Sequence, residues 1–456
     1  MKLAVGPEIK SFKNVMANGL TLVTVEMPHI HTLEIAMFIR VGLRFENMGN
    51  NGVSHFLEHM MFRGNVKYPD SILLNREFEN IGRDLRASTL SEYTWYGFTP
   101  HVSKLEKGME VFAEFFKNPT FPSIELEREI ILEEYLEEMN VEGKNIDINN
   151  IACAAIYEDD PLAMTTIGTD ASIRAINMES LDAHFQKYCN MGNMVLAGAG
   201  AISHDHFLSL AKKYFEPVHN HGITIPRDHF QKRAAPSQDG TRLVFQKDED
   251  SQFQLQICFH ALSYNHPDYY ALGLINRMFD DGVTSRLQRA LREERGVAYS
   301  VECRATSLSD LGTFDFDLTV SPEKLCPALD ILLRVIKRFL ENGLDDNELQ
   351  HVKQRAKFDL DFDFDDPYKQ IIRHGFSELY SQPVTVEEEK SFIDNVSEDD
   401  IRRVAKSVFV KDKMNVILLG PDLPDIREQV ENYINGFTLL SASTAGPSRH
   451  CSFVEL

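Results

Sequence analysis

Four segments in which hydrophobic residues alternate with polar ones or run together predict β-strands. They lie at residues 20–25, 32–41, 242–245 and 253–260, where Val, Ile, Leu and Phe are frequent. In each half of the chain such strands come first, followed by a helical pattern, further strands and two more helices. This order predicts the α+β fold class, with two homologous domains that each hold a mostly antiparallel sheet with helices packed on one side.

A weak internal repeat supports two related halves. Residues 90–92 (Leu-Ser-Glu) match residues 308–310 (Leu-Ser-Asp) at an offset of 218 positions. Helical patterns follow at 104–116 in the first half and at 323–339 in the second. The second half is therefore predicted to repeat the plan of the first.

A polar segment with several Pro and Gly residues separates the halves, and 456 residues are enough for two hydrophobic cores. We predict an N-terminal domain at residues 1–222, a linker at 223–240 and a homologous C-terminal domain at 241–438. The last stretch, 439–456, contains Ser-Ala-Ser-Thr-Ala-Gly-Pro-Ser-Arg and is predicted to be a flexible tail.

Composition and charge narrow the classes of partner. No segment approaches the run of about 18 apolar residues that a membrane span requires, so no membrane association is expected. The formal net charge of −22 argues against nucleic acid, whose phosphates require a basic surface, and suits basic or neutral peptides better. The six cysteines are scattered without a Cys-x-x-Cys pair, and the N-terminus shows no apolar secretory segment, so a cytoplasmic location is expected.

Residues 52–64 predict a short helix bounded by glycines, with one polar face that suits a metal ion. His55, Glu58 and His59 gather on this face, opposite Val53, Phe56, Leu57, Met60 and Met61. Two imidazoles at positions i and i+4 lie about 5–6 Å apart at Cβ, close enough to share one zinc ion. Glu58 would then lie beside the ion without having to bind it. The alternative is a polar helix face without function.

A third ligand is expected from another helix, because catalytic zinc usually takes three protein ligands and leaves one position for water. The acidic helical segment at 123–140 offers many glutamates. Glu127, Glu134 and Glu138 share a stripe with Ile131, so spacing leaves these three as candidates.

The motif and the acidic helix together resemble the family of pitrilysin, insulin-degrading enzyme and mitochondrial processing peptidase, whose inverted zinc motif is His-x-x-Glu-His. The resemblance covers most of the chain. It implies Glu134 as the third ligand to one Zn²⁺ per chain, and Glu127, seven positions earlier, as a residue that supports the ligands. It also implies that Glu58 is the catalytic base.

A second family pattern lies in the other half, where Arg292 and Tyr299 match a pair that the resemblance implies to hold the substrate backbone and to stabilise the oxyanion. At the positions that correspond to the metal residues, this half has Gly273, Asn276 and Arg277 and is not expected to bind zinc there. The resemblance implies that the pair acts on the zinc site of another subunit inside a closed chamber. A homodimer is expected, with a heterodimer with a metal-free homologue as the alternative.

Residues 82–87 correspond to the family's Gly-Gly-x-x-Asn-Ala edge strand, to which substrate adds through main-chain groups. Arg86 and Ala87 are therefore expected to bind substrate, and Arg86 replaces the asparagine of the family. This change is expected to affect substrate choice.

These observations predict a zinc-dependent endopeptidase that cleaves extended, unfolded peptides inside a dimeric closed chamber. The alternative is a non-catalytic scaffold or assembly subunit of the same family. His204 with His206, and His219 with His221, are weaker metal candidates, because no carboxylate partner is evident near them.

Overall fold

The computed structural model describes residues 9–218, 222–226, 229–230, 238–380, 383–439 and 451–454. The chain forms two compact units that are each assembled from separate segments. The first unit takes its residues from Met1–Leu136, Asp160–His229 and Leu360–Val384, and the second from Glu137–Asp159, Phe230–Asp359 and Thr385–Leu456. The predicted linker and tail lie partly outside the described residues.

The first unit contains a six-stranded sheet in which only β2 and β6 pair in parallel. Its central strands are buried along nearly their whole length, as expected where both faces of a sheet are covered. The strand at one edge, β4, pairs with β5 and is the most relevant to function. The strand order is β1 (Lys10–Val15), β2 (Thr21–Glu26), β6 (Met194–Gly200), β3 (Leu33–Ile39), β5 (Thr94–Phe98) and β4 (Arg86–Thr89).

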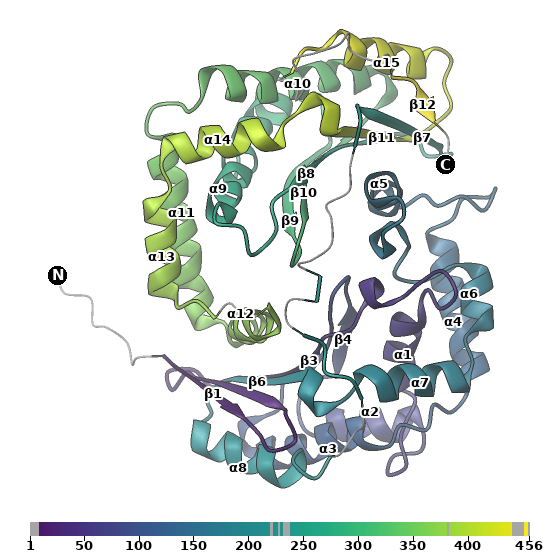
Figure 1. Cartoon of the computed structure of the whole chain (residues 1–456), viewed down its shortest axis with the longest axis vertical. Coiled ribbons are helices and arrows are strands. Elements are labelled where there is room, and N and C mark those ends of the chain that lie inside the picture. Colours follow the sequence, from purple (N-terminus) through teal and green to yellow (C-terminus); the bar gives the residue numbers. More distant parts are fainter. Residues whose placement is uncertain are drawn as a thin grey trace, which may run out of the picture. The chain divides into compact units, whose positions relative to one another are not determined.

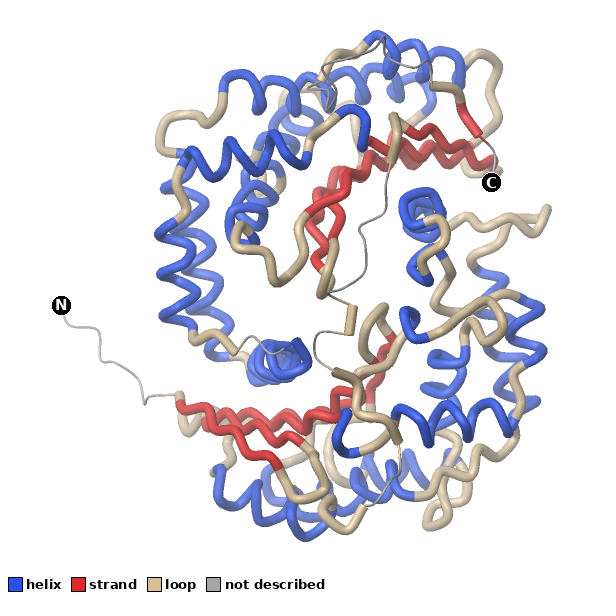
Figure 2. The backbone as a smooth tube through the Cα atoms, in the orientation of Figure 1, coloured by secondary structure: helices blue, strands red, loops and turns tan. Residues whose placement is uncertain are grey.

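The second unit contains a sheet with the equivalent strand order, so the α+β class and the two related halves are confirmed. Figure 2 draws the strands of both sheets in red. Strand β12 was not expected, since it falls in the segment predicted to be a flexible tail. The order is β12 (Phe453–Val454), β7 (Arg242–Lys247), β11 (Met414–Gly420), β8 (Phe253–Ala261), β10 (Gly312–Val320) and β9 (Ser300–Ser307).

Amphipathic helices cover the sheets and bury apolar side chains at every third or fourth position. The helices of the first unit are α1 (Val53–Met61), α2 (Ser71–Glu79), α3 (Leu105–Lys117), α4 (Ile124–Glu137), α6 (Asp170–Ala175), α7 (Met178–Tyr188), α8 (His204–Tyr214) and α12 (Pro367–Tyr380). Those of the second are α5 (Ile148–Tyr157), α9 (Tyr269–Phe279), α10 (Leu325–Asn342), α11 (Glu348–Phe362), α13 (Val386–Asn395), α14 (Glu398–Val408), α15 (Ile426–Gly436) and the π-helix η5 (Gln288–Glu293). Within the described ranges no helix is both long and apolar enough to cross a bilayer.

Each unit also receives one helix from a distant part of the sequence. Helix α12 packs on β3 and β6 of the first unit (Figure 1). There the ring of Phe38 leaves no room for a side chain at Gly375. Helix α5 packs on β8 and β11 of the second unit. The two helices occupy equivalent positions in the repeat, so each sheet has helical cover on the face that the large hydrophobic core does not occupy.

Candidate metal centre

Helix α1 presents the two histidines of the motif because its other face is firmly buried. The apolar residues predicted for that face are at most 3% exposed: Val53, Phe56, Leu57, Met60 and Met61. His55, Glu58 and His59 are partly exposed on the opposite side. The division between a packing face and a polar face therefore follows the sequence pattern.

The start of α1 is held by Gly52 and by the buried carboxylate of Glu46. Gly52 has φ of 88°, and a Cβ there would lie 2.5 Å from the carbonyl oxygen of Ile167, so no other residue fits. Glu46 accepts hydrogen bonds from the backbone N–H groups of Gly52 at 2.7 Å and Ser54 at 2.8 Å. These amides would otherwise be unpaired at the helix start, where a negative charge is also favourable. Glu46 fixes the position of His55 and was not identified from the sequence.

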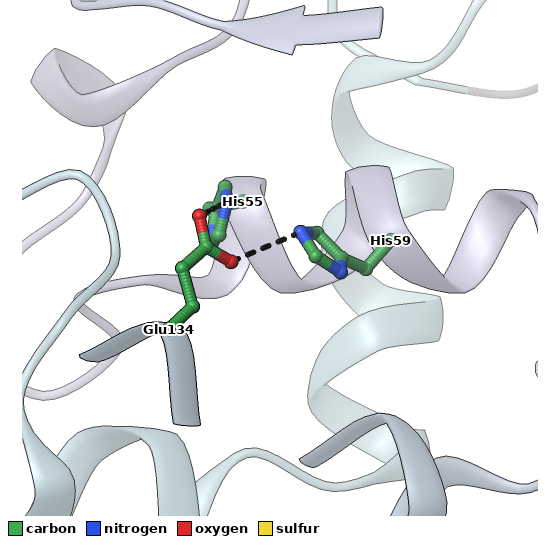
Figure 3. Close-up of side chains that lie close together, drawn as sticks. All are labelled: His55, His59 and Glu134. Atoms are coloured by element: carbon green, nitrogen blue, oxygen red, sulfur yellow. Dashed lines mark ion pairs between the residues drawn. The ribbon is translucent and has the colours of Figure 1, made fainter. Parts of the chain in front are cut away.

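Glu134 of α4 lies opposite the two histidines, and Figure 3 shows its carboxylate facing both imidazole rings. Its oxygens lie 3.6 Å from Nε2 of His55 and 3.5 Å from Nε2 of His59. One ligand atom from each of the three residues lies within 4.8 Å of the others. The structure thus brings together the three residues that the sequence and the resemblance predict as ligands.

These separations fit a zinc ion. They exceed the roughly 2.7–2.9 Å of a charged hydrogen bond. They are close to the spacing of about 3.3 Å that tetrahedral ligands adopt around zinc at about 2.0–2.1 Å. The Glu134 side chain is 46% exposed, so the site is open to solvent.

Glu127 orients the second histidine from behind. Its Oε1 lies 2.9 Å from Nδ1 of His59, which leaves Nε2 of the ring directed at Glu134. Its other oxygen accepts a hydrogen bond from Arg63. Burial acts to raise the pKa of Glu127, but the hydrogen bonds from His59 and Arg63 outweigh it, so the pKa is lowered and the carboxylate stays charged. Carboxylates in this position raise the basicity of zinc ligands.

The two histidines have opposite pKa shifts. Burial and the neighbouring His59 lower the pKa of His55 to about 3, so this ring is neutral across the physiological range. Burial acts to lower the pKa of His59 as well, but its hydrogen bond to Glu127 and the charges of Glu127, Glu134 and Glu58 together raise it. Of the two rings, therefore, only His59 binds a proton that a metal ion must displace near neutral pH.

Glu58 lies on the same face of α1 and contacts the edge strand. Its Oε2 accepts a 2.6 Å hydrogen bond from the hydroxyl of Thr89 on β4. Burial raises the pKa of Glu58, partly offset by this hydrogen bond. Thr89 was not identified from the sequence. Its place three positions after Arg86, and therefore on the opposite face of the predicted edge strand, could have suggested it.

The two residues predicted on the edge strand lie on different faces of the sheet. Ala87 lies two positions from Thr89 and packs against the core on the α1 side. Arg86 points to the opposite face, where it donates a 2.8 Å hydrogen bond to Glu34 and its guanidinium lies 5.4 Å from the ring centre of Tyr368. The structure therefore directs Arg86 away from Glu58.

Arg292 and Tyr299 belong to the second unit and are accessible. The Arg292 side chain is 64% exposed, with its nearest carboxylate, that of Glu293, 4.0 Å away. Tyr299 is 80% exposed and is anchored through its backbone N–H to the carbonyl of Thr319. Both side chains are available to contact another molecule.

The weaker histidine candidates do not form a metal site in the described part of the chain. Both ring nitrogens of His204 are engaged, Nδ1 with Thr24 at 2.9 Å and Nε2 with Asn14 at 2.8 Å. His204 therefore connects α8 to β1 and β2. His219 and His221 lie outside the described residues.

Comparisons with known proteins place the chain among zinc peptidases by similarity. The family described as insulinase (peptidase family M16) matches residues 21–170, and the peptidase M16 inactive domain matches residues 175–356. The chain is 28% identical over 435 residues to the mitochondrial-processing peptidase subunit beta of Bos taurus, covering 91% of this chain and 86% of the relative. It is 25% identical over 402 residues to the uncharacterized zinc protease YmxG of Bacillus subtilis, covering 87% and 95%.

A solved structure shows the same fold. A protease from Helicobacter pylori superposes with a TM-score of 0.80 at 21% identity, covering 91% of this chain and 100% of that chain. The two family matches lie in succession along the sequence and include both the His-x-x-Glu-His helix and the segment with Arg292 and Tyr299. The chain therefore belongs to the insulinase family of peptidases, peptidase family M16.

Proposed function

We propose that the chain is a catalytically active zinc endopeptidase, with one zinc ion held by His55, His59 and Glu134. The observation that carries the proposal is the convergence of these ligand atoms at 3.5 and 3.6 Å beside the carboxylate of Glu58. Zinc protease and processing peptidase are the activities in the names of relatives that share most of the chain. A peptidase function is therefore supported both by the geometry of the site and by the names of the relatives.

Glu58 acts as the general base and then as the general acid. Bound zinc would polarise the substrate carbonyl and lower the pKa of a water molecule toward about 7. Glu58 takes a proton from this water and returns it to the amine that leaves. Its raised pKa favours the first task, because a carboxylate whose pKa lies nearer neutrality takes up a proton more readily than an ordinary carboxylate does. Thr89 holds one oxygen of Glu58, so the other faces the substrate.

The substrate is an extended, unfolded peptide that adds to the free edge of β4. This strand has β5 on one side, and it is joined to the catalytic residue by the bond between Thr89 and Glu58. Strand addition uses main-chain hydrogen bonds, which do not depend on the side chain of Arg86. Arg86 is bonded to Glu34 and would select substrate residues only on the opposite face.

The alternative function, a non-catalytic scaffold or assembly subunit, has one observation in its favour. Residues 175–356 match the family's inactive domain. The first half, however, keeps the three ligands, Glu58 and the supporting Glu127 in one arrangement. A chain without metal chemistry has no need of it.

Zinc content and peptide cleavage separate the two functions. Elemental analysis of the purified full chain is expected to give one zinc per chain, and a chelator is expected to remove both the metal and the cleavage of an unfolded basic peptide. Added zinc should restore both. A chain that contains no zinc, or whose cleavage persists without it, would show that the proposed chemistry is wrong.

We also propose a cytoplasmic homodimer in which Arg292 and Tyr299 act on the zinc site of the other subunit. Support comes from the exposure of both side chains, from a relative that is a subunit by name, and from the six cysteines, which form no disulfide among the described residues. A heterodimer with a metal-free homologue is the second arrangement, and mixing experiments decide whether the pair acts between identical chains.

Two inactive variants are expected to complement each other. Arg292→Ala removes a transition-state donor and Glu58→Gln removes the base, so each alone should lose about 10²-fold or more in kcat. After unfolding, mixing in equal amounts and refolding, half of the dimers are mixed, and each has one complete site, so about a quarter of the wild-type activity should return. No recovery, with dimers confirmed by light scattering, would place the pair and the base in the same subunit.

A further inference from the structure

A pocket in the second unit is lined by an unusual concentration of positive charge. The cavity has a volume of about 130 Å³ and lies between the η5 segment and α10. Two carboxylates, Glu294 and Asp345, also line it, but guanidinium groups outnumber them although the chain has a net charge of −22. The five arginines are Arg286, Arg289, Arg295, Arg334 and Arg338.

One of these arginines is structural. Arg286 forms two hydrogen bonds with Glu348, at 2.7 and 2.5 Å, and a third with the carbonyl of Gly343. Its guanidinium also lies 4.9 Å from the ring centre of Phe339, and its side chain is only 13% exposed. Arg286 therefore connects the start of the η5 segment to α10 and α11, and the other four arginines remain available for a ligand.

The four available arginines have few partners. Arg289 and Arg295 share a single carboxylate, that of Glu294, at 3.4 and 3.0 Å. Arg334 pairs with Asp330 one helical turn earlier and is still 64% exposed. Arg338 is exposed and forms no ion pair or hydrogen bond with any residue that the structure describes. The pocket therefore holds more hydrogen-bond donors than its own carboxylates can use.

An anion would relieve a repulsion on α10 that Asp330, the partner of Arg334, offsets only in part. Arg334 and Arg338 stand four positions apart on one face, a spacing at which like charges destabilise a helix. Ile331 and Val335 stand four positions apart beside them and line the same cavity. This aliphatic surface lowers the local dielectric and strengthens the attraction between the guanidinium groups and an anion.

We propose that this arginine pocket, formed by Arg289, Arg295, Arg334 and Arg338, binds a small phosphate-class oxyanion. Guanidinium groups bind phosphate through paired hydrogen bonds, and groups arriving from two sides offer more donors than the two oxygens of a carboxylate can accept. The remainder of this acidic chain repels anions, so saturable binding requires such a local site.

The bound anion would also connect η5 to α10. Segment η5 is a π-helix, a rare form that is common at functional sites, and it carries Arg292 as well as Arg289. An anion held by Arg289 and by both arginines of α10 restrains η5. Slower hydrogen exchange of the amides of residues 288–296 is therefore expected when the site is filled.

Calorimetric titration of the full chain with inorganic pyrophosphate tests the site without any measurement of peptidase activity. One equivalent is expected to bind, and the double variant Arg334→Gln/Arg338→Gln should weaken binding about tenfold or more. Arg174→Gln is the matched control, because Arg174 is an exposed helical arginine of the first unit that pairs with an aspartate four positions earlier, as Arg334 does. This control should change affinity less than about twofold.

Three outcomes would overturn the proposal. They are the absence of saturable binding, equal affinity in the wild type and the double variant, and citrate binding as tightly as pyrophosphate, which would make the pocket a carboxylate site. Circular dichroism establishes that the variants fold. If the double variant does not fold, Arg338→Gln alone provides the test, because this side chain has no ion pair or hydrogen bond to lose within the described residues.

Discussion

Replacing Glu58 by Gln is expected to lower kcat by about 10²–10⁴-fold while leaving the zinc content at one per chain. The amide has nearly the shape of the carboxylate and still accepts the hydrogen bond from Thr89, so the helix and the ligands stay in place. It takes no proton from water at neutral pH, so the chemical step fails. The measurement is steady-state cleavage of an unfolded fluorogenic peptide, with zinc determined on the same sample.

A glutamate without a role provides the control for this experiment. Glu133 is an exposed residue of α4 next to the proposed ligand Glu134, and Glu133→Gln makes the same chemical change without altering the site. Its kcat is expected to stay within about twofold of the wild type. Equal activity of Glu58→Gln and Glu133→Gln would exclude Glu58 as the base. Loss of zinc from Glu58→Gln would show that Glu58 holds the metal centre together.

Elements with long, regular hydrophobic patterns were predicted closely. The strand expected at 32–41 is β3 (Leu33–Ile39), and the helix expected at 104–116 is α3 (Leu105–Lys117). The exchange of α5 and α12 between the two units could not be predicted in this way. A helical pattern shows which face of a helix is apolar. Which sheet covers this face depends on contacts between segments that lie about a hundred residues or more apart in the sequence.

The choice of the third ligand shows the same limit at the site. Spacing on an ideal helix left Glu127, Glu134 and Glu138 as candidates. Helix α4 ends at Glu137, and Glu138 accepts a 2.9 Å hydrogen bond from Asn150 instead. Glu134 was selected through the resemblance, and its position beside the histidines depends on how α4 packs on α1. Partners such as Thr89 lie on separate elements and follow only from the packed structure.

Replacing Glu127 by Gln is expected to weaken zinc binding about 10–100-fold without removing a ligand. The amide still accepts a hydrogen bond from Nδ1 of His59, so the ring keeps its orientation. It no longer carries the charge that makes the ring more basic, and it leaves Arg63 without its carboxylate partner. Zinc affinity of the metal-free protein is measured by competition with a chromophoric chelator, with Glu133→Gln again as the control.

The deficit of the Glu127→Gln variant should depend on pH, with a sign that follows from His59. In the wild type the pKa of His59 is raised, so zinc must displace a proton until the pH rises above that pKa, and affinity falls as the pH drops through it. The variant loses a cause of this shift, so its pKa is lower and its ring becomes neutral at a lower pH. His55, with a pKa of about 3, adds no pH dependence in this range. The two affinities should therefore converge as the pH falls toward mildly acidic values and separate most above neutrality. A deficit that stays constant across this range would mean that Glu127 only orients the ring, and that its charge has no part in metal binding.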